Sequence, residues 1–182
     1  MQKKNRRSPF RFTTPQLVVL ALLTALQVVL GNLLQVPLVG KQFSFGFLPL
    51  AAASAMLGVP GGLIVGALGD FIGAHLFPAG AYFPGFTLTN ALVGVLYALP
   101  LYHRKPTVVR VIIAVTLATV LNLFLNSLWL SMLYGSKTYW GWITARAGTY
   151  LVEAPAQMVV MFLCLQALGR LKLPPSVQLW KE

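Results

Sequence analysis

The chain has 182 residues, of which 57% are hydrophobic and only 9% are charged. A soluble domain carries about 25% charged residues, so this composition excludes a soluble globular protein and predicts a chain that crosses a membrane several times. The net charge of +11 does not indicate nucleic-acid binding, because the basic residues flank apolar segments and no polar domain displays them.

Apolar segments predict six membrane-spanning helices in one all-α integral membrane domain over residues 1–182. Thr13 and Pro15 are typical of a helix start, and roughly 20 residues from there suffice to cross a bilayer. The run Pro60-Gly61-Gly62 predicts a turn between two spans. Residues 139–144 either begin the last helix or cover a cavity. After a basic arm over residues 1–14, the expected spans are residues 15–34, 45–59, 61–77, 87–102, 107–134 and 146–171.

Basic residues are unevenly distributed between the two ends of these spans. Eleven fall at the end that carries the termini, and three fall at the opposite end with the loops 35–44, 78–86 and 135–145. Because positive residues are retained inside, this asymmetry predicts a multi-pass cell-membrane protein with both termini cytoplasmic. The eleven are Lys3, Lys4, Arg6, Arg7, Arg11, Arg104, Lys105, Arg110, Arg170, Lys172 and Lys181; the three are Lys41, Lys137 and Arg146.

Four glycines in the third span follow one another at intervals of four, three and four residues: Gly62, Gly66, Gly69 and Gly73. On a helix this spacing makes a stripe without side chains, which indicates close packing against a neighbouring backbone. Asp70 lies beside the stripe in an otherwise apolar segment. An acid is costly inside a membrane, so Asp70 is a candidate functional residue.

The loop after the third span combines two prolines with three aromatic residues, Tyr82, Phe83 and Phe86. We expect a rigid loop here, followed by a helix that begins at Thr87 after Gly85. A packed helix, a lone acid and a rigid aromatic loop together indicate a binding site. We place the three aromatic residues and Gly85 in it.

Polar residues on the fifth span are spaced to share one helix face. Asn122 and Asn126 are four residues apart, and Trp129 follows three residues later. The asparagine pair either forms hydrogen bonds between helices, worth roughly 0.6–2 kcal/mol each, or contacts a ligand. The residues leave both interpretations open.

The sixth span carries a second polar face, made of Arg146, Tyr150, Glu153 and Gln157 at intervals of four, three and four residues. Arg146 and Glu153 either neutralise each other through Tyr150 or act on a ligand. Arg146 lies at the outer end of its span, where a carboxylated solute would arrive, so we favour a ligand role for it. For Glu153 we favour a structural role.

Several other functions are not supported by the residue pattern. The chain has no GxxxxGK[ST] sequence for ATP, and His75 and His103 have no further ligand at metal-binding spacing. We find no Ser-His-acid or Cys-His arrangement. We therefore expect neither an enzyme nor a bound metal or cofactor.

Short motifs spread over nearly the whole chain resemble the folate-specific S components, the substrate-binding subunits of energy-coupling factor (ECF) vitamin transporters. The most specific is YFPGFTLT over residues 82–89. The others are FGFLP (45–49), GALGD (66–70), LFP (76–78), NSLWL (126–130), LYG (133–135), and Arg146 followed by PAQ (155–157).

This resemblance implies an ECF S-component bundle that binds folate with high affinity from outside. A transmembrane T component and two ABC-type ATPases, all separate chains, would then drive uptake across the lipid bilayer. Ala21 and Ala25 resemble the family's AxxxA contact with the T component. The sequence departs from the family at Asn32, where we expect an arginine.

The chemistry of folate fits the candidate residues. Stacking on the flat pterin is expected from Tyr82, Phe83, Phe86 and Trp129. The pterin edge, with its N–H and amino group, matches Asp70 or the pair Asn122 and Asn126. The anionic glutamate tail matches Arg146, Lys41 or Lys137. The alternatives are an S component for another vitamin, such as pantothenate or thiamine, and a small structural membrane protein without a solute.

Overall fold

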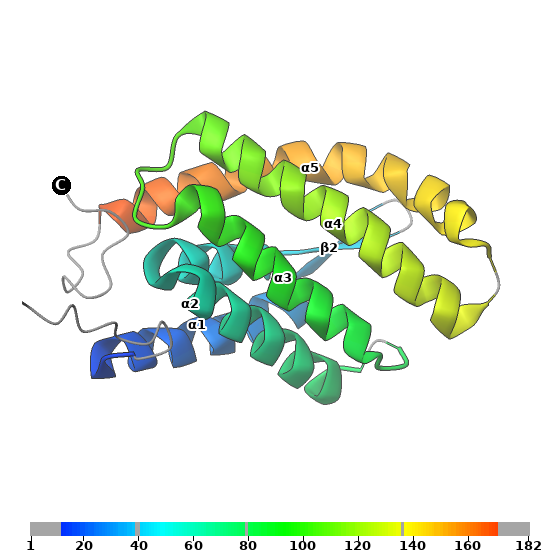
Figure 1. Ribbon diagram of the computed structural model, residues 1–182, viewed down its shortest axis with the longest axis horizontal. Helices are drawn as coiled ribbons and strands as arrows, with labels where there is room; N and C mark the ends of the chain where they lie inside the picture. Colours follow the sequence, from blue (N-terminus) through cyan, green and yellow to red (C-terminus); the bar gives the residue numbers. More distant parts are fainter. Residues whose placement is uncertain (1–11, 39–40, 79, 136, 171–182) are drawn as a thin grey trace, which may run out of the picture.

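The structure, a computed structural model (Figure 1), describes residues 12–38, 41–78, 80–135 and 137–170, with the backbone alone for residues 35–38, 41 and 42. Five helices lie within these residues, and each is long and apolar enough to cross a membrane. The elements in order are α1 (Thr14–Asn32), β1 (Gln35–Leu38), β2 (Lys41–Ser44), α2 (Phe47–Leu76), α3 (Pro84–Leu101), α4 (Val108–Tyr134) and α5 (Tyr139–Gly169).

Two helices begin earlier than the sequence indicated. The helix expected from Thr87 begins at Pro84, because proline is favoured in the first turn, where its missing N–H leaves no bond unmade. Gly85 and Phe86 therefore belong to α3. The helix expected from Arg146 begins at Tyr139, where the Thr138 side chain accepts a hydrogen bond from the backbone N–H of Gly141 at 3.3 Å. Residues 139–144 thus begin the last helix.

The number of spans differs from the expected six, because residues 47–76 form one element with a sharp bend. Gly58 at the bend has φ +70° and ψ −159°, a conformation available to glycine and strained for other residues. Past the bend, a Cβ on Gly61 would lie 3.1 Å from the carbonyl oxygen of Ala53. Residues eight apart in a straight helix are separated by about 12 Å. The chain therefore folds back at Gly58, and α2 consists of two packed arms.

The loop expected over residues 35–44 contains a β-hairpin. β1 and β2 pair antiparallel, with Gln35 opposite Ser44 and Leu38 opposite Lys41. The hairpin is tied to α1 by a hydrogen bond from the backbone N–H of Phe45 to the carbonyl of Leu30 at 3.2 Å. It therefore connects α1 to α2 along a defined path.

The glycine stripe packs as the sequence predicts, and it does so on two sides. Toward α3, Gly62 meets the backbone of Gly94, and Gly66 meets the carbonyl of Asn90. Toward α1, the stripe is covered by side chains, Gln27 over Gly69 and Asn32 over Gly73. The second arm of α2 is consequently held between α1 and α3.

The packed core and the polar residues occupy opposite halves of the bundle. The first arm of α2 is almost fully buried, and it packs with the C-terminal half of α3, the N-terminal half of α4 and the C-terminal half of α5. Figure 1 shows α1 beginning and α5 ending at one end of the bundle, with the α2–α3 and α4–α5 connections at the other. The apolar core fills the end where α1 begins and α5 ends. The end with the α2–α3 and α4–α5 connections is therefore where we look for a site.

Because Gly62 and Gly94 are in close contact, adding one methyl group at Gly94 should strongly destabilise the fold. Gly94→Ala places its Cβ against the backbone of Gly62, which cannot retreat as a flexible side chain can. We expect the free energy of unfolding to fall by about 2 kcal/mol or more, measured by thermal unfolding in detergent. Gly148→Ala is the matched control, since nothing lies within 4 Å of the added Cβ. Equal midpoints for the two variants would contradict the packing account.

Candidate functional site

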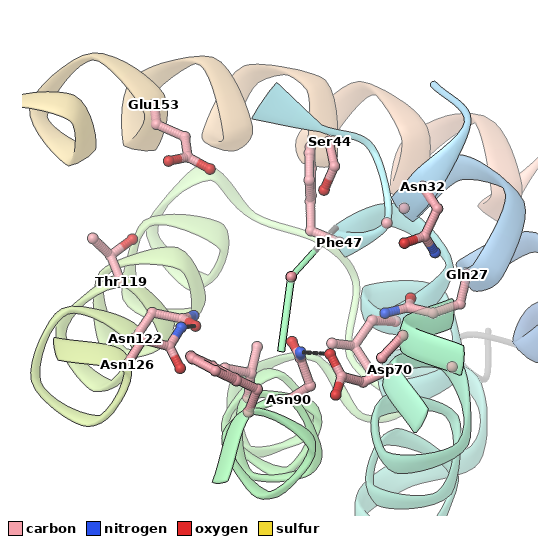
Figure 2. Close-up of a pocket in the computed structure, with 18 of the residues that line it drawn as sticks. Gln27, Asn32, Ser44, Phe47, Asp70, Asn90, Thr119, Asn122, Asn126 and Glu153 are labelled. Atoms are coloured by element: carbon pink, nitrogen blue, oxygen red, sulfur yellow. Dashed lines mark hydrogen bonds between the residues drawn. The ribbon is translucent and has the colours of Figure 1, made fainter. Parts of the chain in front are cut away.

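A cavity of about 460 Å³ lies between the helices in the half of the bundle opposite the core. Every helix contributes to its wall, together with Ser44 at the end of β2. This volume is in the range of sites that bind small molecules. Its polar lining residues, several of them shown in Figure 2, are Gln27, Asn32, Ser44, Asp70, Tyr82, Asn90, Tyr97, Thr119, Asn122, Asn126, Tyr134, Arg146, Tyr150, Glu153 and Gln157.

Asp70 is held by two residues of α3. The Thr87 hydroxyl donates to Oδ2 of Asp70, and the Asn90 amide donates to Oδ1, each at 2.6 Å. The second of these bonds is visible in Figure 2. Both carboxylate oxygens therefore join α2 to α3 at the cavity wall.

The aromatic loop is connected to this pair of bonds. The Tyr82 hydroxyl lies 3.1 Å from the Thr87 hydroxyl. Because Thr87 already gives its single proton to Asp70, the Tyr82 hydroxyl is the donor. The Tyr82 ring also packs against Phe71 and His75 of α2, at centroid distances of 5.9 and 4.8 Å. These contacts fix Tyr82 at the cavity.

A second aromatic group lies against the first turns of α3. The Trp129 indole N–H donates to the hydroxyl of Thr89 at 3.0 Å, and its ring packs 5.5 Å from that of Phe83. A Cβ on Gly85 would lie 2.5 Å from the Trp129 ring, so the glycine admits the indole. This cluster joins α4 to α3 and supports the loop that carries Tyr82.

The asparagine pair on α4 forms a chain of amides with a defined direction. The Asn122 amide N–H₂ donates to the carbonyl of Ala118 at 2.9 Å, and Asn126 donates to Oδ1 of Asn122 at 3.0 Å. Because the Ala118 carbonyl can only accept, both amide orientations follow from it. Oδ1 of Asn126 is buried and makes no hydrogen bond to any described residue.

The polar face expected on α5 is confirmed as one face, since all four of its residues line the cavity. Arg146 donates from Nη2 to the hydroxyl of Tyr150 at 2.8 Å. One turn further, Gln157 donates from Nε2 to Oε1 of Glu153 at 2.9 Å. Glu153 is only 7% exposed. Positive charge thus lies toward the N-terminal end of α5, and negative charge lies two turns deeper.

The residues that were proposed from the sequence do not all line the cavity. Asp70, Tyr82, Phe86, Asn122, Asn126 and Arg146 do. Phe83, Gly85 and Trp129 form the neighbouring cluster and stay predictions as ligand contacts. The side chain of Lys41 lies outside the described residues. Ala21 and Ala25 are on the exposed face of α1, away from the cavity.

Sequence reasoning missed the contribution of α1. Gln27, Gly31 and Asn32 line the cavity, and Asn32 donates to the carbonyl of Val28 at 2.8 Å. Oε1 of Gln27 is buried without a hydrogen-bond partner among the described residues. The available signal was a polar amide in an otherwise apolar span, which is costly unless it has a function.

The arrangement suits a solute that is flat, polar along an edge and negatively charged at one end. Aromatic rings and hydrogen-bonding side chains line the cavity, and Arg146 supplies positive charge at its wall. Among the described residues, no group of three or more His, Cys, Asp or Glu side chains could hold a metal ion.

Comparison with known proteins gives matches over most of the chain. Residues 15–165 match the family model for the substrate-specific component of ECF transporters. Two relatives named folate transporter FolT are each 34% identical. The one from Clostridium novyi (strain NT) matches over 88% of this chain and 94% of its own. The one from Leuconostoc mesenteroides subsp. mesenteroides matches over 85% and 86%.

The fold is similar to a solved crystal structure of FolT bound with folic acid. The TM-score is 0.76 and the sequence identity is 32%, over 85% of this chain and 94% of that one. The sequence and structural similarities each extend over at least 85% of the chain. Together with the apolar helices, they show a multi-pass membrane protein.

Proposed function

Because the chain belongs to the substrate-specific components of ECF transporters, we propose that it is the subunit that captures folate from the extracellular side. The observation that carries this proposal is the cavity, in which Arg146, hydrogen-bonding side chains and aromatic rings face one space of about 460 Å³. The relatives named folate transporter, at 34% identity, support the same ligand. In this role the chain binds a solute and carries out no chemical step.

The proposed ligand places its anionic glutamate at Arg146. The guanidinium lies in the cavity wall near the outer end of α5 and is oriented by the Tyr150 hydroxyl. Lys41 and Lys137, on the same side of the bundle, add positive charge along the approach. The aromatic residues Tyr82 and Phe86 present faces for the pterin, while Phe83, Gly85 and Trp129 hold that part of the wall in place.

Arg146→Ala should weaken folate binding more than it weakens folding. Loss of a charge-assisted hydrogen bond lowers affinity by about 10- to 100-fold. Titration of the purified protein by tryptophan fluorescence measures this change. Arg110→Ala is the control, because Arg110 bonds to the Lys105 carbonyl and lies at the other end of the bundle. Affinity within threefold of the parent, with folding intact, would remove Arg146 from the site.

We further propose that the two arms of α2 cross the membrane separately, which makes six crossings and leaves both termini in the cytoplasm. The fold-back at Gly58 supports this proposal, as does the position of the start of α1 and the end of α5 at one end of the bundle. The excess of basic residues at that end supports a cytoplasmic position for it.

Cysteine labelling tests this topology. In a Cys164→Ala background, Lys41→Cys should react with a membrane-impermeant maleimide in intact cells, and Lys172→Cys should react only after the cells are opened. Five crossings would place the two termini on opposite sides, so reaction of both cysteines in intact cells would contradict the six-crossing arrangement.

Uptake requires energy. We propose that partner chains supply it, namely a T component and two ATPases. The exposed face of α1 offers a contact surface for the T component. Ala21 and Ala25 are exposed there, four residues apart, among exposed leucines and valines. Small side chains let another helix approach closely, which is the usual basis of tight helix contact in lipid.

Ala25→Trp should leave folate binding by the isolated protein intact and abolish both assembly with the partners and ATP-dependent uptake. Ala21→Trp should behave in the same way. Val159→Trp is the matched control, because Val159 is 60% exposed on α5 and away from this face. Co-purification and vesicle uptake measure the effects. Uptake by Ala25→Trp at the parental rate would place the coupling face elsewhere.

A further inference from the structure

The turn between α3 and α4 lies at the end of the bundle opposite the cavity, where α1 begins and α5 ends (Figure 1). It is anchored on the bend of α2. A Cβ on Gly58 would lie 2.9 Å from the Tyr102 ring, which therefore covers the bend. The His103 ring packs 4.2 Å from that of Tyr102, and its backbone N–H donates to the carbonyl of Ala55 at 3.3 Å. These contacts hold His103 at φ +50°, a left-handed conformation that is uncommon outside glycine, and they fix the path of the chain out of α3.

Three basic residues are held together at this turn. Arg104 and Lys105 directly follow His103, and both are exposed. The Arg110 side chain in the first turn of α4 donates from Nη1 to the carbonyl of Lys105 at 2.8 Å, which closes the turn from the α4 side. We call Arg104, Lys105 and Arg110 the basic turn.

The basic turn has no counter-charge in the part of the chain that the structure describes. The two acids of that part, Asp70 and Glu153, line the cavity in the other half of the bundle. Glu182 lies outside the described residues. Like charges held close together repel each other, so an anion bound between them lowers their energy. The basic turn is therefore suited to an anionic group from outside the chain.

An apolar stripe on α4 continues from the basic turn. Its residues follow one another at intervals of three or four, and each is between 41% and 61% exposed: Val109, Ile113, Leu117, Val120 and Phe124. The opposite face of α4 is buried in the bundle, with Val111, Ala114, Val115 and Ala118. The stripe spans 15 residues, or about 22 Å, which exceeds the roughly 15 Å depth of one membrane leaflet. A molecule with an anionic head and a hydrocarbon chain can therefore contact the basic turn and the stripe at once.

We propose that the basic turn and the apolar stripe together bind an anionic glycerophospholipid of the cytoplasmic leaflet. Arg104 and Lys105 hold the phosphate, and an acyl chain lies along the stripe. Arg110 is a positioning residue, because its bond to the Lys105 carbonyl holds the turn in shape. Basic residues next to a membrane-spanning helix attract anionic lipids. A zwitterionic phospholipid carries the same phosphate, but its ammonium group would be repelled by the bases.

A lipid bound at this position also stabilises the fold. Tyr102 and His103 connect the turn to the bend of α2, so the lipid binds a surface that exists only when α2, α3 and α4 are packed. A ligand that binds only the folded state raises the unfolding temperature. The proposal takes the leaflet from the proposed topology and does not depend on which solute occupies the cavity.

Competition between two lipids tests the proposal on the purified full chain. Phosphatidylglycerol and phosphatidylcholine with the same acyl chains are added in equal amounts, and native mass spectrometry counts which lipid is retained. The parent should prefer phosphatidylglycerol by at least about tenfold, since each base near an anionic headgroup contributes about fivefold. In the double variant Arg104→Gln, Lys105→Gln, this preference should fall below about threefold. Phosphatidylglycerol should raise the unfolding temperature of the parent and leave that of the variant unchanged.

The double variant Lys3→Gln, Lys4→Gln is the matched control, because it removes the same charge from the basic arm at residues 1–14. It should keep the parental preference. An equal loss in both double variants would show general attraction by charge and overturn the site. Parental preference in the Arg104, Lys105 variant would also overturn it, and impaired assembly with partner chains in that case would make the turn a protein contact.

Glycerol phosphate separates a lipid site from a site for a soluble phosphate compound. It carries the phosphate without acyl chains and should not displace phosphatidylglycerol from the parent. Displacement at equal concentration would overturn the assignment to a lipid. If the double variant does not fold, Arg104→Gln and Lys105→Gln are measured singly, and each must lower the preference by about fivefold. Single variants that both keep the parental preference would overturn the proposal.

Discussion

Gly62 of α2 and Gly94 of α3 pack backbone to backbone, and the position of the cavity walls depends on this contact. It brings α3 close enough for Asp70 to reach Thr87 and Asn90, and through Thr87 the contact extends to Tyr82. In lipid no hydrophobic force favours helix contact over lipid contact, so close approach and hydrogen bonds supply the attraction. On its other side, the same arm of α2 packs against α1 at Gly69 and Gly73.

Each polar group in a membrane-embedded cavity that lacks a hydrogen bond opposes folding. The rest of the bundle must therefore be packed well enough to offset this cost. In this protein the two requirements are met in separate halves of the bundle. Apolar residues of α2, α3, α4 and α5 pack densely in one half. In the other half, local bonds such as Arg146–Tyr150 and Gln157–Glu153 orient the polar side chains toward the cavity before a ligand arrives. Preorganisation of this kind lowers the entropic cost of binding.

Features that repeat at helical spacing could be predicted from the sequence, and long-range pairings could not. The glycine stripe and the polar face of α5 follow a 3.6-residue period, and both are confirmed. Asp70 is bound by residues 17 and 20 positions later, and Trp129 by a residue 40 positions earlier, which no local pattern reveals. The part of the cavity formed by α1 was missed although a local signal was present, the polar amide of Gln27 in an otherwise apolar span. The run Pro60-Gly61-Gly62 marked the turn in α2, while the residue that makes it is Gly58, where the left-handed φ is visible only in the fold.

We propose that the cavity is a folate site, and ligand binding by the purified chain alone tests this assignment. Protein in lipid nanodiscs is titrated by calorimetry with folic acid, pantothenate and thiamine in turn. A folate site predicts one folic acid bound per chain with high affinity, and no binding of the other two at the same concentrations. Saturable binding of pantothenate or thiamine with none of folic acid would contradict it, and so would the absence of binding by all three.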